Sequence, residues 1–369
     1  MRVGIVGLPL VGKSTIFNLL THGHVDTSSW GGGKGEAHIG VAQVPDPRLD
    51  RLAEVFHPRP KKVTHATVEY VDLPGLARGE SRSLESREMS TYLSSLKNVD
   101  ALMHVVRVFE DEKIPHPEGK VDPLRDIGLF ELEMVFSDLA IVEKRLERLS
   151  RDLKKAKAPE LELEDEILRR FKAALEQEQP LRDLTLTDEE QKRVRGFTFL
   201  SAKPMLLILN LSDQDTAKIT RVVQEFGLER LAAQKHVGIT AVCGKIEAEI
   251  ALLPDEDAKL FMEDLGLAAG GRARIIEQSY SLLGLSSFFT LSEPEARAWT
   301  ILSNTTALQA AGVIHSDFER GFIKAEVVTY EEMIQLGSFQ AARNKGVLRL
   351  EGKDYIVREG DVILFRFNV

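Results

Sequence analysis

The loop from Gly7 to Ser14 carries the clearest chemistry in this chain. It reads Gly-Leu-Pro-Leu-Val-Gly-Lys-Ser, which fits the pattern G-x-x-x-x-G-K-S, and it lies between an apolar run at residues 1–6 and a helical pattern at residues 15–20. Glycines in such a loop let backbone N–H groups surround phosphate oxygens, and the following helix start adds positive potential. The lysine reaches β- and γ-phosphates, and the serine hydroxyl can bind Mg²⁺. The loop therefore predicts a nucleotide-phosphate site.

A second motif, Asp72-Leu-Pro-Gly75, ends another predicted strand. A carboxylate in this position can hold Mg²⁺, usually through water, and the glycine N–H can bind the γ-phosphate. We therefore expect Ser14 and Asp72 to hold the metal and Lys13 and Gly75 to act in catalysis. Leu76 stands where Ras-like GTPases carry a water-orienting glutamine. Because leucine cannot hydrogen-bond, another group must position the attacking water.

Two later loops are candidates for base recognition. Guanine-specific proteins of this class carry N-K-x-D, whereas this chain reads Asn210-Leu-Ser-Asp213 and so replaces the lysine by Leu211. Asp213 keeps a carboxylate, so guanine is disfavoured but GTP stays open as the alternative to ATP. Cys243-Gly-Lys245 follows the next predicted strand and would be the last base-contacting loop. The residues expected to bind nucleotide are Gly7, Leu10, Val11, Gly12, Lys13, Ser14, Thr15, Asn210, Leu211, Asp213, Cys243, Gly244 and Lys245.

The elements that carry these loops alternate between strands and helices. Besides the first strand, apolar runs at residues 68–72, 101–106, 205–210 and 237–242 are predicted to be buried strands. This alternation is typical of an α/β fold with a mostly parallel, doubly wound sheet. A length of 369 residues is sufficient for two or three domains.

Between the second and third of these runs the pattern becomes helical. Leu139, Val142, Leu146, Leu149 and Leu153 follow the 3-4 spacing of a coiled-coil seam, Pro159 interrupts it, and an apolar stripe resumes at residues 161–175. We therefore expect an antiparallel helical hairpin inserted into the nucleotide-binding domain. A basic run lies near its tip, which is either a solvated helix face or a contact for RNA or an acidic partner. The run consists of Arg148, Arg151, Lys154, Lys155 and Lys157.

The last segment, from about Ser286, has short alternating runs at residues 322–328 and 346–350 and turns at residues 351–353 and 359–361. Together with one predicted helix at about residues 330–336, these runs indicate a small α+β module.

Composition limits the possible classes of protein. The apolar content of 43% and charged content of 28% are those of an ordinary globular chain, and no apolar run is long enough to cross a bilayer. Cys243 is the only cysteine, which excludes an intramolecular disulfide and fits a cytoplasmic protein. The net charge of −9 argues against broad nucleic-acid binding, so no DNA partner is expected, although a local basic patch stays possible.

At this point the chain resembles the YchF / Obg-like ATPase family of P-loop proteins over nearly its whole length. The resemblance rests on residues 7–15, 44–49 and 104–107, and it is strongest at residues 298–300, 307–322, 350–355 and 361–368. It implies a G domain with an inserted coiled-coil hairpin and a C-terminal TGS domain of β-grasp type. We place the G domain at residues 1–135 and 200–285, the hairpin at residues 136–199 and the TGS domain at residues 286–369.

The resemblance also implies activity and partners. It implies hydrolysis of ATP in preference to GTP, contact between the Asn210-Leu211 loop and adenine, and association with the ribosome. With Mg²⁺ as cofactor, the first hypothesis is a slow cytoplasmic ATPase in which Lys13, the metal and backbone amides neutralise charge. Two alternatives stay open: a GTPase, and a regulator that binds the ribosome or RNA and uses nucleotide only to set its conformation.

Three departures from the family pattern matter, and the two that lie in the switch segments favour the regulator. The family usually has asparagine, a candidate ligand of a monovalent cation, where this chain has Leu10. Its first switch reads Y-P-F-x-T-I, whereas residues 30–35 here are Trp-Gly-Gly-Gly-Lys-Gly, so the metal-binding threonine is missing unless Thr27 replaces it. The glycine-rich stretch of the second switch is replaced here by residues 80–85, Glu-Ser-Arg-Ser-Leu-Glu.

Overall fold

The computed structural model describes residues 1–21, 38–73, 92–155, 158–267 and 270–368. Two compact units make up the chain. The first contains Met1–Gly40 and Glu69–Gln278, and the second contains Val41–Val68 and Ser279–Val369. Within the described residues, no helix is both long and apolar enough to cross a lipid bilayer.

The first unit is built on a largely parallel sheet with the strand order β2-β4-β1-β5-β6-β7. Its strands are β1 (Arg2–Val6), β2 (His38–Gln43), β4 (Thr67–Asp72), β5 (Ala101–Arg107), β6 (Met205–Asn210) and β7 (Val237–Val242). The pairs β1/β4, β1/β5, β5/β6 and β6/β7 are all parallel. The strands predicted from apolar runs and the doubly wound α/β class are therefore confirmed.

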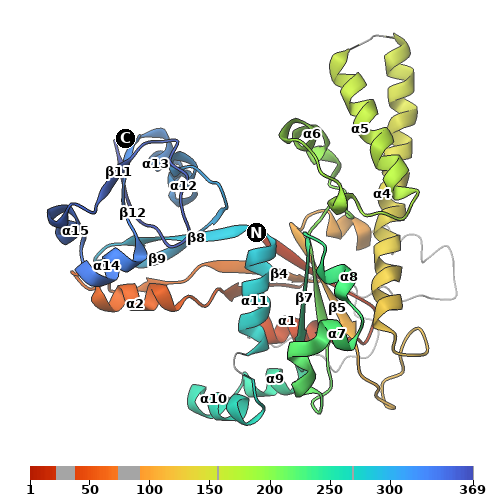
Figure 1. Cartoon of the computed structure of the whole chain (residues 1–369), viewed down its shortest axis with the longest axis horizontal. Helices are drawn as coiled ribbons and strands as arrows, with labels where there is room; N and C mark the ends of the chain where they lie inside the picture. Colours follow the sequence, from red (N-terminus) through yellow and green to blue (C-terminus); the bar gives the residue numbers. More distant parts are fainter. Residues whose placement is uncertain (22–37, 74–91, 156–157, 268–269, 369) are drawn as a thin grey trace. The chain divides into compact units, whose positions relative to one another are not determined.

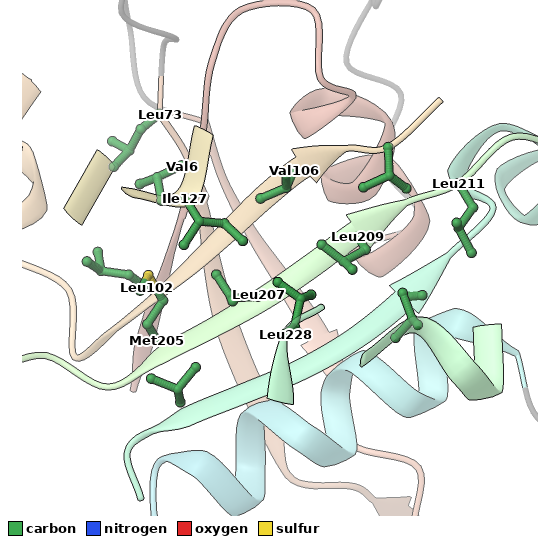
Figure 2. Packing of buried hydrophobic residues seen from close by; sticks show 14 of the residues in the cluster. Val6, Leu73, Leu102, Val106, Ile127, Met205, Leu207, Leu209, Leu211 and Leu228 are labelled. Atoms are coloured by element: carbon green, nitrogen blue, oxygen red, sulfur yellow. The ribbon is translucent and has the colours of Figure 1, made fainter. Parts of the chain in front are cut away.

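Helices cover both faces of this sheet (Figure 1). The helices of this unit, including those of the insertion, are α1 (Lys13–Thr21), α4 (Pro123–Lys155), α5 (Pro159–Leu175), α6 (Asp188–Val194), α7 (Val222–Glu225), α8 (Glu229–Ala232), α9 (Gly244–Ile250), α10 (Asp255–Asp264) and α11 (Gly271–Leu282). Alternate residues of β5 and β6, among them Leu102, Val106, Leu207 and Leu209, face one apolar core that Ile127 of α4 completes (Figure 2). This core holds the strand ends from which the predicted loops emerge.

The insertion is an antiparallel pair of helices, α4 and α5, as the apolar spacing predicted. Val142 and Leu149 are fully buried between them. Arg145 of α4 donates two hydrogen bonds to Glu164 of α5, at 2.6 and 2.9 Å. α4 starts at Pro123, thirteen residues before the predicted boundary, because its first turns still pack against the sheet core.

The chain returns from the hairpin through a segment held by Asp138 of α4. This carboxylate is fully buried and accepts hydrogen bonds from the N–H groups of Leu200 and Ser201 and from the Ser201 hydroxyl, at 2.7 to 2.9 Å. Burial raises the pKa of Asp138, while these hydrogen bonds lower it. The base of the insertion is thus fixed to the sheet-side part of α4.

The second unit has a mixed sheet with the strand order β11-β10-β12-β8-β9-β3. Its strands are β3 (Val63–Thr64), β8 (Leu285–Leu291), β9 (Ala296–Leu302), β10 (Phe322–Val328), β11 (Arg349–Glu351) and β12 (Val362–Phe367). Its helices are α2 (Pro47–Val55), α12 (Ala307–Ile314), α13 (Ser316–Arg320), α14 (Tyr330–Leu336) and α15 (Phe339–Lys345). The predicted α+β character is confirmed.

Two details of this unit differ from the sequence prediction. The prediction of one helix was wrong, since α12, α13 and α15 accompany α14. The predicted strand at residues 346–350 begins only at Arg349, because Gly346 has a φ of 77° and ends α15. In addition, residues 41–68, which we placed in the first domain, group with the second unit. There α2 buries Leu49 and Leu52, and β3 pairs with β9.

Candidate nucleotide site

The phosphate loop joins β1 to α1 over residues 7–12, as the sequence predicted. Gly7 and Gly12 have φ values of 140° and 100°, which residues with a Cβ rarely adopt. A Cβ at Gly7 would collide with the carbonyl oxygen of Val105, and one at Gly12 would collide with the side-chain amide of Asn210. The loop conformation and its close neighbours therefore require both glycines.

Lys13 points back into its own loop. Its Nζ donates to the carbonyl oxygens of Gly7 at 3.2 Å and Leu8 at 2.8 Å, and only 9% of the residue is exposed. Burial lowers the pKa of Lys13 to about 8, although the nearby Asp72 carboxylate favours its charged form. An anion placed over the loop would give this ammonium group a stronger acceptor than either carbonyl.

Ser14 and Asp72, far apart in sequence, meet beside this lysine. The Ser14 hydroxyl donates to Asp72 Oδ2 at 2.9 Å, and the other carboxylate oxygen, Oδ1, is buried without a hydrogen-bond partner among the described residues. Burial raises the pKa of Asp72, against the hydrogen bond from Ser14 and the charge of Lys13. A buried oxygen without a partner normally meets water or an ion, and oxygen donors suit Mg²⁺. The two residues therefore fit the expected metal.

The two base loops are joined to the phosphate loop by Asn210. Its side-chain amide donates to the Val11 carbonyl at 2.9 Å, and its carbonyl oxygen accepts from the Gly244 N–H at 3.1 Å. The Cys243 thiol donates to the carbonyl of Ser212 at 3.3 Å. Burial raises the pKa of this thiol to about 12, so it stays protonated at neutral pH. The structure thus connects three of the predicted loops by hydrogen bonds: the phosphate loop, the loop that begins at Asn210 and the loop that begins at Cys243.

Three relatives identify the family. The ribosome-binding ATPase YchF of Bacillus subtilis (strain 168) is 42% identical, with full coverage of both chains. The chain belongs to the YchF family. The Haemophilus influenzae protein of the same name is 40% identical over 100% of this chain and 99% of its own. The solved structure described as the Schizosaccharomyces pombe YchF GTPase matches with a TM-score of 0.84 at 29% identity, covering 99% of this chain and 97% of that one.

Two family models match separate parts of the chain. Residues 2–131 match the model described as a 50S ribosome-binding GTPase. Residues 285–368 match the model of the YchF GTPase C-terminal region, which is described as a protein of unknown function. The resemblance that the sequence motifs indicated is confirmed, and with it the P-loop type of the first unit.

Several predicted YchF site residues have environments that the sequence did not indicate. Leu211 is 2% exposed and packs in the sheet core next to Leu209 (Figure 2), because its N–H continues the β6/β7 ladder with a bond to Val242. Packing of this side chain on a base would require it to leave the core. Lys245 is exposed, whereas Asp213 and Thr15 are half-buried.

Leu10 has an unusual backbone. Its φ of 63° lies in the left-handed region, and 44% of the residue is exposed at the top of the phosphate loop. Asparagine is several times more common than leucine in this conformation, and it is the residue expected here from the family pattern.

Several predicted residues lie outside the described part of the chain: Gly75, Leu76, Thr27, the two switch segments at residues 30–35 and 80–85, and Lys157 of the basic run. Their predicted roles stay predictions.

Sequence reasoning missed Glu247 and Tyr92. Glu247 is buried and accepts a hydrogen bond from the Cys243 N–H at 3.2 Å. Tyr92 is also buried and hydrogen-bonds the backbone of Gly7. Glu247 lies four residues after Cys243, one more than in a capping box, so no local motif marked it. Tyr92 gave no local signal either, because its contact joins segments 85 residues apart.

The motif His104-Val-Val-Arg107 on β5 has an internal role. The His104 ring packs on Phe130 of α4 with ring centroids 4.5 Å apart. Burial lowers its pKa to about 3, and the charge of Lys13 acts in the same direction, so His104 is neutral. Arg107 donates to the carbonyls of Phe109 and Ile114, both at 2.9 Å, and thereby fixes the loop after β5.

Proposed function

We propose that this YchF family member is a Mg²⁺-dependent nucleoside triphosphatase that prefers ATP to GTP and hydrolyses it slowly. The observation that carries the proposal is the juxtaposition of Lys13 with the Ser14–Asp72 pair at the start of α1. The relatives named ribosome-binding ATPase support it, since they align with this chain over its full length.

In this proposal the β- and γ-phosphates take the place of the Gly7 and Leu8 carbonyls as acceptors for Lys13. The N–H groups of the loop and the N-terminus of α1 bind the remaining oxygens. Ser14 and, through water, Asp72 would hold Mg²⁺, which supplies positive charge against the negative charge that develops on the phosphates. Gly75 would donate its N–H to the γ-phosphate. Slow hydrolysis follows from the absence of a hydrogen-bonding side chain at Leu76.

The preference for ATP rests on the base loops. A guanine-specific site would use a lysine in place of Leu211, and Asp213 alone offers guanine one carboxylate. Calorimetric titration with ATP and GTP side by side tests the preference, and Lys13→Ala tests the site. Loss of the charged hydrogen bonds should weaken ATP binding by about 2–4 kcal/mol. GTP binding tighter than ATP binding would favour the GTPase alternative, and unchanged ATP affinity in Lys13→Ala would overturn the phosphate-site assignment.

We further propose that the protein works in the cytoplasm as a partner of the ribosome. The names of the relatives support this role. The hairpin, expected to be a coiled coil, offers the exposed cations Arg148, Arg151, Lys154 and Lys155. Basic side chains grouped on one segment of an acidic chain suit ribosomal RNA. The second unit, expected to be a TGS domain, would contribute shape and hydrogen bonds.

A measurement of hydrolysis distinguishes the proposed enzyme from the alternative, a regulator for which nucleotide is only a conformational ligand. Single-turnover hydrolysis of bound ATP should exceed the rate of hydrolysis in solution. A bound rate equal to the solution rate, together with nucleotide-dependent ribosome co-sedimentation, would favour the regulator.

A further inference from the structure

Glu247, in the first turn of α9, joins the last base loop to a helix far along the chain. It is 3% exposed. Its Oε1 accepts from the Cys243 N–H at 3.2 Å, and its Oε2 accepts from the N–H of Gly271, the first residue of α11. Nη2 of Arg274, one turn further along α11, lies 3.5 Å from Oε1. A single buried carboxylate therefore bridges the loop and α11.

The bridge requires a carboxylate and a glycine. Each of the two oxygens faces a backbone N–H group, and Oε1 also faces Nη2 of Arg274, so both oxygens must act as acceptors. A Cβ at position 271 would collide with Glu247 Oε2 and with the side chain of Val242. Burial raises the pKa of Glu247, and the charge of Arg274 counteracts it.

The other side-chain contacts of the base loop connect it to residues at and after the end of β6. The Gly244 N–H is held by Asn210, and the Cys243 thiol is held by the carbonyl of Ser212. Both of these contacts connect the loop to the end of β6. Within the described chain, the Glu247 bridge connects this loop to α11, next to a hydrogen bond from Arg274 of α11 to the Ala241 carbonyl of β7 at 3.2 Å.

We propose that Glu247 is a positioning residue for the nucleoside half of the ligand. By holding the Cys243 N–H, it presents residues 243–245 to the base. The phosphate loop is connected to this loop through Asn210, which bonds the Val11 carbonyl and the Gly244 N–H, and not through Glu247. This inference rests on the proposed nucleotide site and adds to it a residue that determines affinity for the base rather than for the phosphates.

The experiment compares ATP with inorganic tripolyphosphate, which has the phosphates without the nucleoside. Glu247→Gln keeps the size of the side chain but places an amide NH₂ against one of the two N–H groups. It should weaken ATP binding by about tenfold and leave tripolyphosphate binding within about twofold. Glu249→Gln, on an exposed position of the same helix, is the matched control and should change neither affinity.

Gly271→Ala tests the bridge from the other side, because the new Cβ displaces the Glu247 carboxylate. It should lower the ratio of ATP to tripolyphosphate affinity in the same direction, and it carries the test if Glu247→Gln does not fold. An equal loss of both ligands, or an unchanged ratio, overturns the inference. Failure of the wild-type protein to bind either ligand would instead contradict the proposed phosphate site, so the two failures are distinguishable.

Discussion

The pH dependence of phosphate binding should report directly on the burial of Lys13. In the free protein, burial lowers its pKa to about 8. When phosphates bind, their negative charges lie beside Nζ and should return the pKa to at least its usual value of about 10.5. The bound state then holds more protons than the free state between pH 8 and 10.5, so binding must weaken as the pH rises through this range.

The size of the effect follows from the two pKa values. With the lower one at about 8, the apparent Kd should rise roughly 20-fold between pH 7.5 and 9.5, which corresponds to about 1.8 kcal/mol. At pH 9, binding should take up about 0.9 proton. His104, which interacts with Lys13, has a pKa of about 3, and the Cys243 thiol of the base loop has a pKa of about 12, so neither group titrates between pH 7.5 and 9.5.

Isothermal titration of ATP in EDTA, in two buffers with different ionisation enthalpies, measures both quantities. EDTA keeps the charges around Lys13 to those of the protein and the nucleotide. Lys203→Arg is the control, since Lys203 also has a lowered pKa but is held by the carbonyls of Lys97 and Val99. It should leave the pH profile unchanged. A flat affinity from pH 7.5 to 9.5 without proton uptake would refute the reasoning.

Four further perturbations follow from the site and the hairpin. Asp72→Asn keeps an acceptor for Ser14 but removes the charge, so it should weaken the Mg²⁺ dependence of ATP binding at least about tenfold and spare binding in EDTA; equal Mg²⁺ stimulation would contradict the metal assignment. Leu211→Lys should lower the free energy of unfolding by at least about 2 kcal/mol, because it buries an ammonium group. An unchanged stability in denaturant titration would contradict the burial of this side chain. Hydrolysis should be nearly equal in potassium and sodium salts, since Leu10 presents no side-chain oxygen, and a several-fold potassium stimulation would imply another ligand. Alanine in place of all four exposed hairpin cations should weaken ribosome co-sedimentation and reduce the slope of log affinity against log salt concentration by about three to four. An unchanged slope would mean that these side chains only form a solvated helix face. The four cations are Arg148, Arg151, Lys154 and Lys155.

Local patterns were sufficient for the phosphate loop and for five of the six strands of the first sheet, whereas β2, which is mostly exposed, was not predicted. The loop needs glycine where the backbone turns, and the strands of a parallel sheet are apolar on both faces, so residue type alone marks both. The same logic located α14 and the hairpin seam. It failed for α12, whose face of small residues, Ala307, Ala310 and Ala311, has a weak apolar periodicity.

Long-range pairing was beyond the reach of the sequence. Leu211 looks like a base-contacting residue from its motif, but the β6/β7 ladder turns its side chain into the core. Glu247 is ordinary within its helix and becomes significant only because Gly271 lies against it. The grouping of residues 41–68 with the C-terminal unit depends on β3 meeting β9, a pairing that no local pattern encodes.

That grouping has a consequence for how the chain folds during synthesis. The second unit is assembled from Val41–Val68 and from the segment that begins at Ser279, with most of the first unit translated between them. Until the late segment emerges, Leu49 and Leu52 of α2 have no core to enter, and β3 has no β9 to pair with. A nascent or truncated chain that ends near residue 278 would expose this apolar helix and an unpaired strand edge, both of which promote aggregation. Conversely, a fragment that begins at residue 279 would lack α2 and β3, so independent folding of the second unit requires both pieces of chain.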